Sequence, residues 1–579
     1  MAAQPPVFTT LNECQDCYKC VRHCHAKAIR IENGHAAVIQ EACVACGECV
    51  RICPAHAKKI RSDISRLRQL LADDTPVYAS VAPSWLTYFP DWSPGQLISV
   101  LRQLGFAGVS ETAHGAQLVS SATATFLREH PEGLWLSSAC PAAVDYIRKY
   151  HPHIADRIVP LDSPVQAHCK QLRATLGKIH IVFFGPCAAK KNEADRHPDV
   201  LTLACTFQHL DQLLHESDIV PDPNAERETF ILGSAEEGRA YPFEGGMNDT
   251  LRDPAGPVKR YFAVSGLENI DRFSATVDPV HGPLHFVEML ACHGGCINGP
   301  AMKPGNCTYE ALERTDSFAQ TARSSSLGRD VPYDLSHDYP SDSYSMRSPA
   351  PDQLSKALQS VGKFSLEDEL NCGACGYDSC RDFAAALLAG KAETSMCHTF
   401  LRKNFERKSS ALIKYIPAGV VIVDKDLHIL ECNSQFVDLM GPDARTIYDT
   451  LHNLDGVDLS RNFPFAHLFS SILKNGGETT KFSQTWGKMV VNVSVFSIMP
   501  GKVAGAVVQD VTRSEIQREE IAERAQELIL KNVHTVQEVA KLFGEHIAES
   551  EILLNQIAGK FSDRSASMGP AHHDKRSLS

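Results

Sequence analysis

The sequence contains no apolar run long enough to cross a membrane. Its 579 residues include no stretch that approaches about 18 consecutive apolar side chains, the length that a spanning helix needs. The first residues, MAAQPPVFTTLNEC, lack the basic and then apolar segments of an export signal, and no twin-arginine signal is present. We therefore expect a cytoplasmic protein without a membrane span.

An excess of positive charge is also missing. The formal net charge of −12 at pH 7 argues against general affinity for nucleic acids or anionic membranes. The chain is 43% hydrophobic and 22% charged, as soluble globular proteins are. Because one hydrophobic core cannot serve a chain of this length, we expect several domains.

Disulfide bonds are not expected either, although the chain has 20 cysteines. Cytosolic thiols stay reduced, so metal ligation is the better interpretation. Two runs near the N-terminus share the spacing C-x2-C-x2-C-x3-C, and they resemble the bacterial two-cluster ferredoxins. The runs are Cys14, Cys17, Cys20, Cys24 and Cys43, Cys46, Cys49, Cys53.

This resemblance implies that the fourth cysteine of each run crosses to the other 4Fe-4S cluster. One cluster would then be held by Cys14, Cys17, Cys20 and Cys53, and its partner by Cys43, Cys46, Cys49 and Cys24. Zinc is the alternative, but zinc sites usually pair two separated C-x2-C units. We predict an electron-carrying ferredoxin-like domain over residues 1–62.

Residues 75–312 alternate β-rich apolar runs such as KIHIVFF with helical segments such as PGQLISVLRQLG, which predicts an α/β domain with a partly parallel sheet. Three cysteine motifs lie at strand-to-loop transitions. They are SSACP with Cys140, FFGPCAAKKNEADR with Cys187, and VEMLACHGGCINGP with Cys292 and Cys296. In order and separation they resemble the signature motifs of iron-only (FeFe) hydrogenases, as do VAPSW and LGFAGVSETAHGA.

The resemblance implies an H-cluster, a 4Fe-4S cubane joined to a diiron subsite that bears CO, cyanide and azadithiolate. Cys296 would bridge the two parts, and Lys190 would donate a charge-assisted hydrogen bond to a cyanide. The turn containing Pro83 and Ser84 would approach another diatomic ligand. Gly294 and Gly295 would let the backbone approach the cofactor. The cubane would be held by Cys140, Cys187, Cys292 and Cys296.

The sequence departs from the family where protons are carried. Catalytic members usually read TSCCP, and Ala139 stands where the proton-passing cysteine would be. Acids of the same path are replaced by Ala122 and Thr123, and two expected methionines by Gly185 and Leu290. Positioned proton transfer contributes about 10²- to 10⁴-fold, so we expect slow turnover. Candidates for a substitute acid are Glu111, Glu193 and His293.

Two further segments follow in the sequence. Residues 313–355, rich in Ser, Asp and Pro, predict a linker. Residues 356–405 resemble a small helical Fe-S domain with one more 4Fe-4S cluster, and the helix RDFAAALLAGKAET would return the fourth ligand. Zinc is again the alternative. The four ligands would be Cys372, Cys375, Cys380 and Cys397.

Residues 406–515 carry no cysteine pattern. They resemble a PAS domain through Asp426, Ile429 or Leu430, and Asn433, and through alternating hairpin strands and a closing DVT. We expect no PAS cofactor, since Cys432 and His428 are single residues of types that more often pack than ligate.

Residues 516–560 predict a long helix with a narrow apolar stripe, typical of a dimeric coiled coil or a partner-docking helix. The alternative is a helix that folds back on its own domain. His534 would suggest a phosphoacceptor, but no kinase ATP-binding domain follows it. The tail, 561–579, is expected to be disordered.

Together these observations predict a multidomain chain of α/β and α+β class. The leading hypothesis is a sensory FeFe hydrogenase that reacts with H2 and protons and signals through its PAS and helical segments. Its partners would be ferredoxin or another electron carrier, hydrogenase maturation proteins, a kinase or phosphatase, and a second copy of the chain. The alternatives are a metabolic ferredoxin-linked hydrogenase and a non-catalytic Fe-S scaffold without the diiron subsite.

Overall fold

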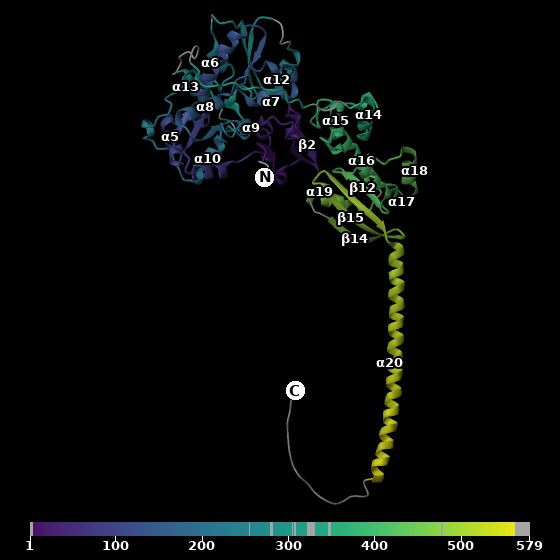
Figure 1. Cartoon of the computed structure of the whole chain (residues 1–579). Coiled ribbons are helices and arrows are strands. Elements are labelled where there is room, and N and C mark those ends of the chain that lie inside the picture. The colour runs from purple at the N-terminus through teal and green to yellow at the C-terminus, as the bar shows by residue number, and fades with distance from the viewer. Residues whose placement is uncertain are drawn as a thin grey trace, which may run out of the picture. The chain divides into compact units, whose positions relative to one another are not determined.

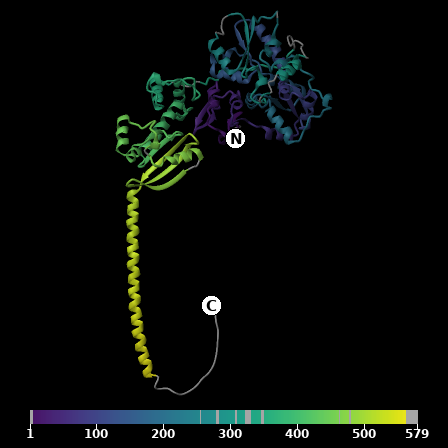
Figure 2. The ribbon, with the colours of Figure 1, turned by 180° about the vertical axis from the view of Figure 1, so that it is seen from behind.

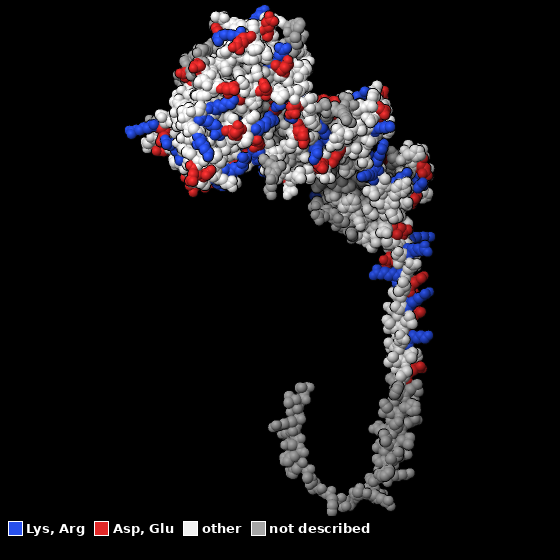
Figure 3. Space-filling model, viewed as in Figure 1, with Lys and Arg blue, Asp and Glu red and all other residues white. Residues whose placement is uncertain are grey.

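The computed structural model contains two compact units, Met1–Arg402 and Lys403–Ser579 (Figures 1 and 2). None of the described helices is both long enough and apolar enough to cross a bilayer. On the described surface that faces the viewer in Figure 3, Lys and Arg are intermixed with Asp and Glu over the first unit. The described residues are 4–253, 255–277, 282–303, 305, 309–320, 330–344, 349–461, 463–475 and 479–561.

The N-terminal segment folds as two short antiparallel ladders with a short helix in each cysteine run. Strand β1 pairs with β4, and β2 pairs with β3. Helices α1 and α2 each contain the third cysteine of a run. The elements are β1 (Val7–Thr9), α1 (Lys19–Arg22), β2 (Ile29–Glu32), β3 (His35–Val38), α2 (Glu48–Arg51) and β4 (Lys58–Ile60).

The central domain contains two parallel sheets, where the sequence predicted one that is partly parallel. One has the order β6-β5-β8-β9 and the other β10-β11-β7. Parallel strands need helical crossovers, and their apolar runs are buried on both faces. The strands are β5 (Val77–Val81), β6 (Gly108–Glu111), β7 (Leu134–Leu136), β8 (His180–Gly185), β9 (Leu203–Thr206), β10 (Arg260–Ser265) and β11 (His285–Leu290).

Four helices of this domain flank the cysteine motifs. Pro141, directly after Cys140, is the first residue of α7, where its missing N–H costs no helical hydrogen bond. Helix α9 begins two residues after Cys187. Both helices therefore start beside a motif cysteine. The four helices are α6 (Ala113–Glu129), α7 (Pro141–Tyr150), α8 (Pro164–Leu176) and α9 (Ala189–Arg196).

The expectation of a linker over 313–355 is wrong for its described part. Helix α13 (Tyr309–Gln320) and helix α14 (Pro351–Ser360) extend into this stretch. Residues 330–344 form a strap on the central domain: the N–H of Asp162 donates to the carbonyl of Leu335 at 2.8 Å, and Leu335 is buried. The polar composition suggested a solvated chain, but backbone hydrogen bonds and a few apolar anchors suffice to hold the strap.

The second unit contains a five-stranded antiparallel sheet of order β13-β12-β16-β15-β14. Its last helix, α20 (Thr512–Phe561), is longer than the predicted 516–560. The tail predicted to be disordered, 561–579, lies outside the described residues except for Phe561. The strands are β12 (Gly419–Asp424), β13 (Ile429–Cys432), β14 (Thr479–Trp486), β15 (Met489–Met499) and β16 (Val503–Asp510).

Candidate functional site

The two N-terminal cysteine runs share an unusual backbone as well as a spacing. Asp16 and Ala45, which follow the first cysteine of each run by two residues, have φ of 51° and 52°. The same repeat relates Tyr18 to Gly47, also at positive φ. Non-glycine residues rarely adopt this conformation, and such strain clusters at ligand-binding sites. The repeated strain supports two equivalent metal-binding loops.

The thiols of these runs fall into two neighbourhoods. The pKa of Cys20 is raised to about 11, mainly by burial and in part by the nearby thiols of Cys14, Cys17 and Cys53. Burial likewise raises the pKa of Cys49 well above its ordinary value, and the thiols acting on it are those of Cys46, Cys24 and Cys43. Each neighbourhood thus contains three cysteines of one run and the last cysteine of the other, as the ferredoxin pattern predicts.

Backbone N–H groups already point at two of these sulfurs. The N–H of Ala28 lies 3.3 Å from Sγ of Cys24, and the N–H of Ala45 lies 3.3 Å from Sγ of Cys43. Such donors stabilise negative charge on sulfur. The donor set is therefore suited to thiolates that hold an anionic cluster.

The motif cysteines of the central domain come from three loops that leave the carboxyl ends of parallel strands. Cys140 follows β7, Cys187 follows β8, and Cys292 and Cys296 follow β11. Burial raises the pKa of Cys292 well above its ordinary value, and Cys296, Cys187 and Cys140, in that order, raise it further. The structure thus brings all four thiols together at the strand ends, where α/β folds bind ligands.

A cavity of about 100 Å³ adjoins these thiols, between the ends of the two sheets. Its wall is mainly apolar, with little polar surface for water. The hydroxyl of Ser84 is fully buried and has no hydrogen-bond partner among the described atoms. Burying a hydroxyl without a partner is costly unless a ligand supplies one. Residues of the wall include Ala82, Pro83, Ser84, Ala139, Cys140, Cys187, Lys190, Glu288, Leu290 and Cys296.

Lys190 reaches this cavity from α9, but its ammonium is already partnered. Its Nζ lies 2.7 Å from Oε2 of Glu193 and donates to Oγ of Ser163 at 3.0 Å. The hydroxyl of Ser163 in turn donates to Glu193. All three side chains are buried. The ion pair fixes the ammonium at the edge of the apolar cavity, where it can donate to a bound anion.

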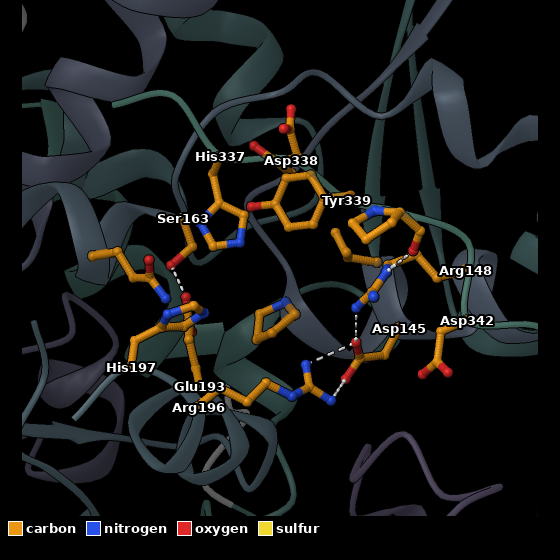
Figure 4. A pocket seen from close by; sticks show the side chains of 15 residues that line it. Asp145, Arg148, Ser163, Glu193, Arg196, His197, His337, Asp338, Tyr339 and Asp342 are labelled. Atoms are coloured by element: carbon orange, nitrogen blue, oxygen red, sulfur yellow. Dashed lines mark hydrogen bonds and ion pairs between the residues drawn. The ribbon is translucent and has the colours of Figure 1, made fainter. Parts of the chain in front are cut away.

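A second, polar cavity of about 380 Å³ lies on the other side of Glu193 (Figure 4). The strap contributes His337 and Tyr339 to its wall, and Asp145 forms ion pairs with Arg148 and Arg196 there. The sequence does not predict this cavity, because the strap residues that line it have the polar composition of a linker.

Two of the sequence departures place a small apolar side chain against one apolar cluster. Ala139 and Ala122 both pack against the same apolar cluster, around Val119 and Phe286. At Gly185 an added Cβ would lie 2.4 Å from the ring of Phe183, so this ring occupies the space of the missing side chain. Of the departures, Ala139 and Leu290 line the apolar cavity, and both side chains are apolar.

The glycines of the third motif both adopt a left-handed backbone conformation. Gly294 and Gly295 have φ of 69° and 104°, and a Cβ on Gly295 would lie 2.1 Å from the carbonyl oxygen of Pro242. Gly295 thus allows a close approach to a neighbouring loop, and the expected backbone approach to a cofactor stays a prediction.

None of the three candidate acids lines the apolar cavity, but Glu193 pairs with Lys190, which does. Glu111 is fully buried and its carboxylate is held by Arg239 at 2.8 and 2.7 Å. His293 is largely exposed and pairs with Glu268 at 2.6 Å, in a groove beside Cys292. Neither of these two lines the apolar cavity.

The sequence reasoning missed Glu288. This carboxyl lines the apolar cavity on the same face of β11 as Leu290, and burial raises its pKa to about 7. Its oxygens accept from the N–H groups of Met247 and Asn248 at 3.3 Å. The two-residue periodicity of a strand could have revealed Glu288. Leu290 is one of the departures from the family motifs, and the side chain two residues before it faces the same side of the strand.

The ferredoxin-like segment and the central cysteines meet at one groove. Cys46 and Cys292 both line it, and Cys46 is among the thiols that raise the pKa of Cys292. Nearby, a Cβ added to Gly47 would lie 2.4 Å from Pro300. The two cysteine regions are therefore packed directly against each other.

Three of the four cysteines of the small domain lie close enough for their thiols to interact. The thiols of Cys397 and Cys372 act on Cys375, whose pKa is raised mainly by burial. Cys380 is buried at the first residue of α15 (Cys380–Leu388), and Cys397 directly precedes α16 (His398–Tyr415). The predicted helix RDFAAALLAGKAET extends only to Leu388, and a separate 3-10 helix (Thr394–Met396) leads to Cys397.

Three family models match parts of this chain. Residues 75–300 match the iron only hydrogenase large subunit, C-terminal domain; residues 7–54 match a 4Fe-4S dicluster domain; residues 368–398 match a putative Fe-S cluster domain. The predictions of a hydrogenase-like α/β domain and of a 4Fe-4S ferredoxin-type domain are thereby confirmed.

Among curated proteins, the chain is 24% identical over 280 residues to the periplasmic Fe hydrogenase large subunit of Nitratidesulfovibrio vulgaris, covering 38% of this chain and 65% of that one. It is 25% identical over 248 residues to the cytosolic Fe-S cluster assembly factor narfl of Xenopus tropicalis, covering 32% and 51%. The chain thus spans about half to two thirds of the length of these relatives. A solved FeFe-hydrogenase is 19% identical, with a TM-score of 0.40, over 49% of this chain and 100% of its own.

Proposed function

We propose that residues 75–312 react reversibly and slowly with H2 at an H-cluster, in a cytoplasmic protein that senses H2 or redox state. The observation that carries the proposal is the gathering of four thiols from three distant loops beside an apolar cavity. Soft thiolates select iron-sulfur clusters. The four ligand atoms are sulfurs and not oxygens, and the buried Ser84 hydroxyl has no partner among the described atoms. Both features suit the composite cofactor.

In this proposal each side chain has a defined task. Cys140, Cys187, Cys292 and Cys296 would hold the cubane, and Cys296 would also hold the diiron subsite, which supplies the hydrogen chemistry when bound. Lys190, fixed by Glu193, would orient the subsite through a cyanide. Ser84, in the turn after Pro83, would donate to another ligand.

Slow turnover follows from the wall of the cavity. Ala139 has no exchangeable proton, and the carboxylate of Glu111 is committed to Arg239. Glu193 lines the polar cavity, where its two oxygens are paired with Lys190 and Ser163, and Lys190 lines the apolar cavity. The side chains of this chain can therefore hold protons near the cavity but offer no thiol at the usual position.

The second unit would serve as the output. Its strand order supports a PAS-like domain, and Asn433 ties β12 to the helix before it by accepting from the N–H of Val420 and donating to the carbonyl of Ile413. Helix α20 exposes Leu528, Ile529 and Val533, which would pack against a second copy or a kinase or phosphatase partner.

A cluster-carrying scaffold without the diiron subsite is the second candidate. The match to a cytosolic Fe-S cluster assembly factor favours it, as does the apolar replacement of the residues around Ala139. A metabolic hydrogenase that exchanges electrons with ferredoxin is a third reading of the same fold.

Infrared spectroscopy of the protein produced with hydrogenase maturation proteins tests the proposal. We expect CO and cyanide bands that shift under H2, together with low turnover. If these bands were absent from a sample whose 4Fe-4S clusters are fully loaded with iron, the proposal would be refuted in favour of the scaffold without the diiron subsite. Turnover as fast as that of metabolic hydrogenases would remove the sensory interpretation.

A further inference from the structure

The small Fe-S domain, residues 368–398, is fixed onto the ferredoxin-like segment by hydrogen bonds. The N–H of Ile31 on β2 donates to the carbonyl of Lys391 at 2.9 Å. The ammonium of Lys391 donates to the carbonyl of Lys27 at 3.3 Å, and Lys27 pairs with Asp378 at 3.3 Å. Figures 1 and 2 both show β2 beside the helices of this domain.

Lys391 anchors this contact from a buried position. Only 6% of its surface is exposed, and its ammonium also lies 5.0 Å from the ring centroid of Tyr344 on the strap. A buried ammonium is costly without partners. Because its partners come from the ferredoxin-like segment and the strap, Lys391 is stable only while the small domain is docked.

The loops that carry the cysteines touch each other directly. Arg22 donates to the carbonyl of Cys17 at 3.0 Å and to the carbonyl of Ala374 at 3.4 Å, so one guanidinium bridges both loops. Gly376 has a φ of 95°, and a Cβ there would lie 2.9 Å from Cγ1 of Val21. The glycine thus permits an approach that no other residue would allow.

The interface is apolar where the cysteines lie. Val21, Ile29 and Ile31 share one cluster of buried side chains with Tyr377 and Met396. Cys20 and Cys397, from the two cysteine sets, are buried members of the same cluster. Cys24 and Cys375, also from the two sets, pack against this cluster as partly buried residues.

We propose that residues 368–398 are a built-in electron port, whose docked interface passes electrons between the ferredoxin-type clusters and the cluster held by Cys372, Cys375, Cys380 and Cys397. With the clusters bound, one electron would leave a ferredoxin-type cluster, which would be oxidised, and would enter the cluster of the small domain, which would be reduced, with no bond or proton exchanged. Under the proposed function, H2 oxidation would supply the electron. Electron transfer between the clusters requires only that the clusters be present.

The port lies next to the helix that enters the second unit. Cys397 immediately precedes α16, and its carbonyl accepts from the N–H of Leu401 at 2.9 Å. The sulfur that would bind the last cluster and the first turn of this helix therefore belong to one short segment. A change in the charge of the bound cluster would therefore act directly at the first turn of α16.

The test is electron paramagnetic resonance of the full-length, cluster-loaded protein reduced with dithionite. We expect signals broadened by magnetic interaction between the small domain's cluster and its ferredoxin-type neighbours. The double variant Lys391→Met and Gly376→Val should abolish this interaction while the iron content stays unchanged. Lys363→Met is the matched control, because Lys363 is equally buried but donates to the carbonyl of Asp368, five residues further along the chain.

The outcomes separate this proposal from the proposed function. Unbroadened signals from all clusters of the unmodified protein would overturn the electron port. So would an interaction that survives in the double variant, or one that the control loses equally. Missing CO and cyanide bands alongside a normal interaction would instead refute only the H2 chemistry.

Discussion

Restoring the missing thiol by Ala139→Cys is the sharpest perturbation that the chain offers. Ala139 lies in the loop between β7 and α7, and its N–H donates to Oγ of Ser137 at 3.1 Å. Its side chain lines the apolar cavity together with Cys140. A cysteine adds one sulfur to a cavity of about 100 Å³, so the thiol can enter without moving the backbone.

The expected gain follows from how much of the proton path is restored. A positioned acid or base contributes about 10²- to 10⁴-fold to a rate. Ala122 still packs in an apolar cluster, and the buried hydroxyl of Thr123 has no partner among the described atoms. Because the outer path stays broken, we expect the lower end, a gain of up to about 10²-fold or ~2.7 kcal/mol in the barrier.

The assay is H2 oxidation and H2/D2O exchange by the maturated protein, normalised to the intensity of its CO bands. Ala139→Val is the control, since valine fills a similar volume but carries no exchangeable proton. We expect faster turnover in the cysteine variant only. Equal gains in both variants would show that cavity volume limits the rate. No gain in either variant would show that proton transfer at this position does not limit the rate.

Three further outcomes are expected. Cys140→Ser should abolish the CO and cyanide bands, and normal bands would contradict the ligand assignment. Lys190→Met leaves the buried Glu193 carboxylate unpaired and should destabilise the central domain by about 3 kcal/mol, most of it recovered by adding Glu193→Gln, as calorimetry can measure. Burial lowers the pKa of His209 from 6.5 to about 3. The unfolded chain therefore binds the extra proton first, and the free energy of unfolding should fall as the pH drops from 6.5 toward 3, less so in His209→Gln.

The metal-binding loops were the most predictable part of the chain. A run such as Cys14 to Cys24 closes within one loop, so its spacing alone restricts the backbone, and the repeated positive φ of Asp16 and Ala45 shows that restriction. Strand and helix periodicities likewise predicted the α/β character of the central domain and the helix after Cys380.

The strap shows why composition misled. Residues 330–344 are polar, yet Leu335 and Tyr339 anchor them, and Tyr339 donates to the carbonyl of Leu161 at 2.8 Å. A segment that binds through its backbone and a few anchors has no periodic signal. The polar cavity that it helps to enclose was invisible for the same reason.

The sequence by itself determined which residues can bind iron, because ligand chemistry and short spacings are local properties of the chain. Only the tertiary structure decided that thiols more than 100 residues apart, such as Cys140 and Cys292, share one site. It also decided that Glu288 faces the cavity and that the small domain docks on β2. These features depend on how sheets and loops pack across long separations, and no local pattern encodes such contacts.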